Sequence, residues 1–289
     1  MSFWTEALGA SVRYVDAAGV RTRIIEAGDG PAVFMTHGLT GHAEGFIRNV
    51  VPIAEAGYHV YAVDAVGHGY SAKPEDVTYN PATFVAHLMA VMDSVGVERA
   101  HFIGQSLGAW TAWRLALAHP ERVLSLTSAT GAGFRLADAE SERTSREVHA
   151  RVGAVSKAAL DEPTRERVRA RLEWLMADPG SVTEELVETR YAIFNLPDSR
   201  QVMGKVNADL TSDDTREDML TEADLMRTTV PVLILWTDSN PTTPASVARR
   251  AAELVPGARF ELIENAGHWP QFEQADAFNR IIIDFLSAV

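Results

Sequence analysis

The sequence contains no cysteine at any of its 289 positions. This absence excludes disulfide bonds, a thiol nucleophile and thiolate metal sites, and it suits a reducing compartment. The chain also has no apolar run near the roughly 20 residues that a membrane-spanning helix needs. Its first residues, Met1-Ser-Phe-Trp, lack a basic region followed by an apolar stretch, so no signal peptide is expected. We therefore expect a cytoplasmic protein with no membrane partner.

Basic residues are fewer than acidic ones, with 26 Lys and Arg residues against 39 Asp and Glu residues. The net charge of −13 argues against nucleic acids and anionic membranes as partners. A hydrophobic content of 46% with 22% charged residues is ordinary for a globular protein. The length suffices for one large α/β domain with an inserted subdomain.

Short apolar runs alternate with helical segments through most of the chain. This alternation predicts an α/β fold whose mostly parallel, eight-stranded sheet is covered by helices on both faces. The first two strands flank Ala17-Ala18-Gly19 and read as a hairpin. The expected strands are Ser11–Asp16, Val20–Glu26, Ala32–Thr36, His59–Val63, the run from Ala100, Val123–Ser128, Val230–Trp236 and Arg259–Ile263; the expected helices include Ala43–Ala56, Pro81–Val95, Ala245–Leu254 and Gln274–Ser287.

The alternation stops between about Phe134 and Met226, where charged segments with helical character dominate and segments with strand character are almost absent. We expect a core domain made of residues 1–133 and 227–289. Residues 134–226 would form a helical cap over the carboxyl ends of the strands. The alternative is one more helical layer behind the sheet.

The segment Gly104-Gln-Ser106-Leu-Gly108 has the G-x-S-x-G pattern between an apolar strand and a helix, which is the context of a nucleophile elbow. The glycines permit a strained turn packed closely against its neighbours. The turn would expose the hydroxyl of Ser106 above the sheet. The amide of Leu107, at the helix N-terminus, would face an oxyanion.

A serine hydroxyl needs a base that takes its proton. His268 lies on a glycine-bearing loop after the last expected strand, and we interpret it as that base. The acid that orients the histidine should follow the strand Val230–Trp236, where Asp238 and Asn240 are found. The simpler interpretation of these two residues is a polar turn before a helix.

These motifs together resemble the α/β-hydrolase superfamily over essentially the whole chain. Within it, the chain resembles the hydrolases of meta-cleavage products, which cut a C–C bond in 2-hydroxy-6-oxo-dienoates. The superfamily resemblance rests on His37-Gly38, Asp64-x-x-Gly67-x-Gly69-x-Ser71, the elbow, His119-Pro-Glu-Arg-Val123 and Gly267-His268. The finer one rests on Gly267-His268-Trp269-Pro-Gln-Phe-Glu273, Leu186-Val-Glu-Thr-Arg190-Tyr191 and the opening Phe3 to Asp16.

The resemblance implies a small-molecule substrate and neither a cofactor nor a metal. It assigns the second oxyanion amide to Leu39, although the loop His37-Gly-Leu-Thr-Gly41 departs from the His-Gly-x-Gly-Pro-Gly of many members. Arg190 matches the cap arginine that pairs with the substrate carboxylate, a task that suits a bidentate guanidinium. Gln105 stands where asparagine is common and would contact the dienoate, and Trp269 would form a pocket wall.

The acid is the main departure, because the family's Asp position, counted from Trp236, holds Asn240. An amide can position a histidine but supplies no charge for an imidazolium. Three explanations stay open: Asn240 orients His268, Asp238 substitutes, or the site has lost its acid, naturally or by design. We favour Asn240.

The predicted function is a cofactor-independent serine hydrolase acting on the C–C bond of a meta-cleavage product. A carboxylesterase or lactonase would use the same atoms on an ester. A catalytically weakened member that only binds small molecules is the alternative of another class, and Asn240 motivates it. The sequence leaves a homodimer open.

Overall fold

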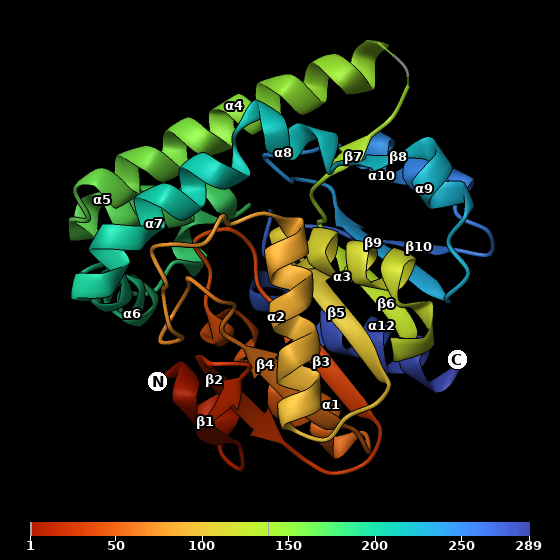
Figure 1. Ribbon diagram of the computed structural model, residues 1–289, viewed down its shortest axis with the longest axis horizontal. Helices are drawn as coiled ribbons and strands as arrows, with labels where there is room; N and C mark the ends of the chain where they lie inside the picture. Colours follow the sequence, from red (N-terminus) through yellow and green to blue (C-terminus); the bar gives the residue numbers. More distant parts are fainter. Residues whose placement is uncertain (1, 138) are drawn as a thin grey trace.

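The computed structural model describes residues 2–137 and 139–289. Its centre is an eight-stranded sheet in the order β1-β2-β4-β3-β5-β6-β9-β10 (Figure 1). The pairs β1–β2 and β2–β4 are antiparallel and the others are parallel, which confirms the predicted fold class. The strands are Ser11–Ala17 (β1), Val20–Ala27 (β2), Ala32–Thr36 (β3), His59–Val63 (β4), Ala100–Gln105 (β5), Val123–Ala129 (β6), Val232–Thr237 (β9) and Arg259–Ile263 (β10).

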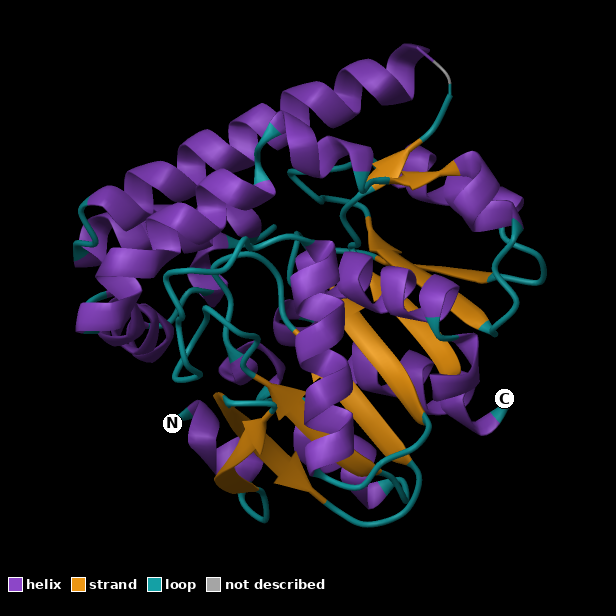
Figure 2. Cartoon of the chain, in the orientation of Figure 1, coloured by secondary structure: helices purple, strands orange, loops and turns teal. Residues whose placement is uncertain are grey.

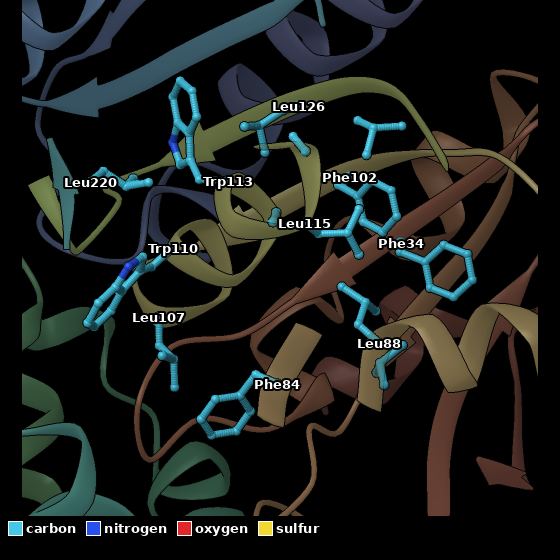
Figure 3. Packing of buried hydrophobic residues seen from close by; sticks show 14 of the residues in the cluster. Phe34, Phe84, Leu88, Phe102, Leu107, Trp110, Trp113, Leu115, Leu126 and Leu220 are labelled. Carbon is cyan, nitrogen blue, oxygen red and sulfur yellow. The ribbon is translucent and has the colours of Figure 1, made fainter. Parts of the chain in front are cut away.

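Helices cover both faces of the sheet because its central strands are apolar on both sides (Figure 2). Along β3, Phe34 belongs to the buried cluster that includes residues of α2, α3 and α10, whereas Val33 and Met35 belong to the cluster that includes residues of α1 and α12. Figure 3 shows part of the first cluster, including Trp113 and Leu115 of α3. The five helices are Val50–Glu55 (α1), Pro81–Ser94 (α2), Leu107–Ala118 (α3), Ala245–Leu254 (α10) and Ala275–Ser287 (α12).

The helix expected over Ala43–Ala56 is wrong as a single element. A short 3-10 turn, Ala43–Phe46, is followed by α1 at Val50–Glu55. Proline has no N–H and clashes with the carbonyl four residues earlier, so Pro52 is tolerated only in the first turn of a helix. The amide of Ala43 is held separately by the Asp64 carboxylate at 2.7 Å.

The segment between β6 and β9 forms a group of helices beyond one end of the sheet (Figure 1). That end carries the carboxyl termini of the strands, because the loop after β10 donates from His268 N to the carbonyl of Leu175 in this segment, at 2.6 Å. The helices are Ala139–Asp161 (α4), Arg165–Leu175 (α5), Glu184–Phe194 (α6), Pro197–Leu210 (α7), Asp213–Glu217 (α8) and Glu222–Met226 (α9). The division into a core, 1–133 and 227–289, and a cap, 134–226, stays a prediction.

Two short strands also lie in this segment, Phe134–Arg135 (β7) and Leu220–Thr221 (β8), and they pair in parallel. The sequence did not indicate them, because two residues are too few to show an alternating pattern. Their pairing joins the start of the segment to its end.

Among the described residues, no helix combines the length and the apolarity needed to cross a bilayer. The edge strand β1 exposes Val12 and Tyr14. The homodimer that the sequence left open stays a prediction.

Candidate active site

The elbow has the geometry that its glycines were expected to allow. Ser106 lies between β5 and α3 with φ at 53°, a left-handed conformation that is costly for a serine. A Cβ at Gly104 would lie 2.4 Å from the backbone of Ala109, and one at Gly108 would lie 2.1 Å from the carbonyl oxygen of Thr36. Only glycine fits at either position. Leu107 begins α3, so its amide has no acceptor within the helix.

The loop after β3 passes directly over the nucleophile. A Cβ at Gly38 would lie 2.9 Å from the Cβ of Ser106, so the residue must be glycine. His37 fixes this loop, since its Nε2 accepts a hydrogen bond from Ala65 N at 3.1 Å and its Nδ1 lies 2.9 Å from Gly38 O. Burial lowers the pKa of His37 to about 4, so the ring is neutral and holds this pattern at neutral pH. Leu39 follows on the same loop and lines the cavity beside Ser106.

The backbone of His268 is held from both sides. Its carbonyl accepts from Gln105 Nε2 at 3.0 Å and from Thr130 Oγ1 at 2.9 Å, while its amide donates to α5. The amide of the preceding residue, Gly267, donates to the carboxylate of Glu273 at 2.7 Å. The imidazole therefore projects from a fixed main chain.

Asn240 Oδ1 lies 3.0 Å from His268 Nδ1. The same oxygen accepts from the backbone N–H of Thr242 at 3.2 Å and from its hydroxyl at 2.9 Å. A backbone N–H can only donate, so it identifies the amide atom beside it as oxygen. Because that oxygen also faces the ring, Nδ1 carries the hydrogen and Nε2 is left as the base.

Asp238 has a different position. Its carboxylate accepts from the amides of Asn265 at 3.0 Å and Ala266 at 3.4 Å, and it bonds to neither nitrogen of His268. The hydrogen bond from Asn265 is the main reason that the pKa of Asp238 is lowered. Asp238 thus fastens the loop that carries His268.

One cavity contains the hydroxyl of Ser106 and the imidazole of His268, and Leu39, Leu107 and Trp269 line it as well. Ser106 Oγ and the imidazole form no hydrogen bond in the described part of the chain. Catalytic hydrogen bonds are often long before substrate arrives and tighten in the complex. Burial, and to a smaller extent the charge of Arg171, lowers the pKa of His268 to about 3, so the base is unprotonated at neutral pH.

Gln105 and Arg190, the predicted substrate contacts, have different surroundings. Gln105 lines the cavity, but its amide nitrogen donates to the carbonyl of His268. Arg190, on α6, is completely buried, and its three guanidinium nitrogens have no partner among the described residues. Its Cζ lies 4.7 Å from the ring centroid of Trp269, which lines the cavity, whereas Arg190 itself does not. The roles predicted for both residues stay predictions.

Residues 31–275 match the family described as the alpha/beta hydrolase fold. The chain belongs to the α/β-hydrolase family. A 2-hydroxy-6-oxononadienedioate/2-hydroxy-6-oxononatrienedioate hydrolase of Paraburkholderia phymatum is 30% identical over 95% of this chain and 90% of the relative. A 2-hydroxy-6-oxo-6-phenylhexa-2,4-dienoate hydrolase of Comamonas testosteroni is also 30% identical, over 90% of this chain and 89% of the relative.

The solved structures agree with this assignment. A meta-cleavage product hydrolase from Pseudomonas fluorescens, in a complex with acetates, superposes with a TM-score of 0.81 at 26% identity, covering 97% of this chain and 99% of the other. The predicted resemblance is confirmed, and the protein is an enzyme of the hydrolase class.

The sequence did not single out two residues that lie at the site, Thr242 and Arg171. Thr242 had no signal beyond its place in a polar turn. Arg171 had one, because it stands on the apolar face of α5 with Val168, Leu172 and Leu175. An arginine that falls at the helical spacing of the apolar residues is expected to be buried. A buried charge needs a partner, which marks such an arginine as a candidate ligand-binding residue.

Proposed function

We propose that this hydrolase cleaves the C–C bond of a 2-hydroxy-6-oxo-dienoate, the class of compound that extradiol ring cleavage produces. The observation that carries the proposal is the completely buried, unpartnered guanidinium of Arg190 close to a serine–histidine site. A buried cation without a counter-ion is costly, and a substrate carboxylate in the adjoining cavity would supply the missing counter-charge. A neutral ester would not. The two relatives at 30% identity support the same substrate class.

The residues would share the chemistry as follows. His268 Nε2 takes a proton from Ser106, or from a water, which then attacks the C6 carbonyl. The amides of Leu39 and Leu107 stabilise the oxyanion that forms. Trp269 would form part of the wall around the substrate.

The leaving carbon needs an acceptor for its electrons. An enol-to-keto shift moves the proton of the C2 hydroxyl to C5, and we assign its transfer to His268. The bond between C5 and C6 then breaks, its electron pair moves along the carbon chain to the C2 oxygen, and that oxygen regains a proton. One water is consumed and ends in the carboxylic acid and the proton. The products are a 2-hydroxypenta-2,4-dienoate and a carboxylic acid.

Orientation of the base by Asn240 completes the proposed machinery. Its oxygen is the acceptor that lies beside Nδ1 of His268. The arrangement favours the tautomer that catalysis requires but adds no negative charge.

The test is turnover of 2-hydroxy-6-oxo-6-phenylhexa-2,4-dienoate, followed by its loss of visible absorbance and by benzoate formation, beside p-nitrophenyl acetate. We expect benzoate, and we expect Ser106→Ala to abolish it. Ser94→Ala, which removes the Oγ that bonds the carbonyl of Val91 at the end of α2, should leave the rate unchanged. Hydrolysis of the ester alone would replace the proposal by an esterase function. Binding of the dienoate without turnover would indicate the weakened, binding-only member.

A further inference from the structure

The cavity joins the two hydrophobic clusters that lie on opposite faces of the sheet. Trp110, Phe134 and Leu210 belong to the cluster of α2, α3 and α10, whereas Leu175 and Trp269 belong to that of α1 and α12 (Figure 3 shows Trp110). Ser106 and His268 line the same cavity. The cavity therefore has two different ends.

The two ends differ in charge. Among the described residues, Arg171 is the one permanently charged side chain in the cavity wall, and it lies on α5 beside Leu175. The opposite end is apolar and carries no cation. Its wall comes from Trp110, Phe134, Leu210 and Val247.

Arg171 is nearly buried at 4% exposure and has no carboxylate partner among the described residues. Nε and Nη1 make no hydrogen bond, and Nη2 donates only to Ser156 Oγ, at a long 3.3 Å. The ring of Trp174 lies 4.9 Å from Cζ, a cation–π contact that orients the guanidinium without neutralising it. A buried cation at a cavity wall that has no carboxylate partner in the protein is suited to bind an anionic group of the ligand.

Arg190 supplies a second unpaired guanidinium close by. The two charges repel each other, and burial together with the charge of Arg171 lowers the pKa of Arg190 to about 9. One carboxylate between them would relieve the repulsion and provide acceptors for donors that now have none. Arg171 is the member of the pair that a ligand in the cavity can touch.

We propose that Arg171 binds the substrate carboxylate directly, with Arg190 behind the cavity wall adding positive charge, and that the opposite end of the cavity selects an uncharged, apolar acyl group. This inference rests on the proposed function and narrows its substrate class to dienoates with one carboxylate. A dienedioate, the class named for the Paraburkholderia relative, would place its second carboxylate against an apolar wall with no cation. That substrate should be disfavoured here.

The test uses unreactive ligands, so that it does not depend on turnover. Isothermal titration calorimetry compares 6-phenylhexanoate, its neutral amide 6-phenylhexanamide, and nonanedioate. We expect the phenyl carboxylate to bind at least tenfold more tightly than either of the others. Arg171→Gln should weaken the carboxylate about ten- to a hundredfold, as loss of charged hydrogen bonds does, and leave the amide unchanged. Arg167→Gln, an exposed residue one turn earlier on α5, is the matched control and should change nothing.

Thermal unfolding of Arg171→Gln must show a folded protein, which we expect because the substitution removes a buried charge. Equal losses for carboxylate and amide would mean that Arg171 only shapes the cavity, and would overturn the inference. If nonanedioate bound as tightly as 6-phenylhexanoate, the proposed selection of an uncharged acyl group by the apolar end of the cavity would be wrong. If these affinities hold but no dienoate is cleaved, the proposed reaction fails while the anion site stands.

Discussion

At the residue scale, Asn240 stands where the family resemblance led us to expect an aspartate. In a serine protease, replacing the orienting Asp by Asn costs about four orders of magnitude in rate, largely because the wrong tautomer of histidine is stabilised. Here Thr242 turns the amide oxygen toward His268. The tautomer is therefore correct without a carboxylate.

We predict that Asn240→Asp changes kcat by no more than about tenfold, because the tautomer is already right and a carboxylate gains only charge. Its second oxygen would occupy the buried, unpartnered site of Nδ2, which opposes ionisation. Asn240→Ala should lower kcat at least about a hundredfold. Steady-state kinetics measure both. A gain on the order of ten-thousandfold for Asn240→Asp would show that the present amide holds the wrong tautomer.

The pH dependence of the enzyme is a second prediction at this scale. The acid limb of kcat/KM reports the pKa of the base in the free enzyme. Since the pKa of His268 is lowered to about 3, the base stays unprotonated and kcat/KM should not fall until the pH is well below 6.5. In Arg171→Gln one of the two causes is removed, so the acid limb should move to higher pH. An unmoved limb in that variant would contradict the electrostatic contact.

At the scale of elements, the motif Asp64-x-x-Gly67-x-Gly69-x-Ser71 proves to be a clamp between loops. Arg23 of β2 lies between the carboxylates of Asp64 and Glu44, with its Nε 2.7 Å from Asp64 and its Nη2 2.6 Å from Glu44. Asp64 also accepts from the amide of Tyr70 at 2.8 Å, and Ser71 Oγ donates to the carbonyl of Asp64 at 2.8 Å. The clamp fixes the loop after β4 against the turn at Ala43–Phe46.

We predict that Arg23→Met lowers the free energy of unfolding by about 3–5 kcal/mol, because it leaves the buried carboxylate of Asp64 without a cation and that of Glu44 with only the imidazole of His42. Urea denaturation measures this loss. Arg21→Gln, on the same strand but exposed, should change the free energy of unfolding by less than about 0.5 kcal/mol. Similar losses for the two variants would mean that the clamp contributes nothing beyond ordinary strand packing.

Element boundaries could be predicted where proline or glycine flanks a periodic segment, as Pro244, Pro256 and Gly257 do here. Strand β10 was expected at Arg259–Ile263 and lies there, and α10 was expected at Ala245–Leu254 and lies there. The helix through Pro52 failed, because apolar spacing does not register a proline's missing N–H and steric clash. The strands β7 and β8 failed because they depend on pairing across the cap segment and not on local pattern.

At the scale of the whole molecule, burial keeps several histidines neutral. The pKa of His37 and of His87 is lowered to about 4, that of His268 to about 3, and that of His68 well below its usual value, in each case first by burial. In the unfolded chain these rings would titrate near 6.5. Between about pH 4 and 6.5 the unfolded state therefore binds more protons than the folded state.

We predict that the free energy of unfolding falls as the pH drops below about 6.5, by up to about 1.4 kcal/mol per pH unit for each such histidine. Urea denaturation between pH 5 and 7.5 measures the slope. His87→Gln should remove the contribution of about one proton from this slope. His119→Gln, at a side chain that is 44% exposed, should leave the slope unchanged. A stability that is flat across this range would contradict the neutral, buried state of the rings.

The sequence by itself determined the α/β architecture, the elbow at Ser106 and the family, because these depend on local spacing: apolar runs, and glycines where a side chain cannot fit. It also indicated His268, whose loop is defined by its place after the last strand. Tertiary structure alone decided that Thr242 turns the oxygen of Asn240 toward that ring, and that Arg171 and Arg190 lie buried with no carboxylate partner among the described residues. These features depend on which side chains meet across distant loops and helices, and on how deeply those side chains are buried. Neither is encoded in the spacing along any one segment.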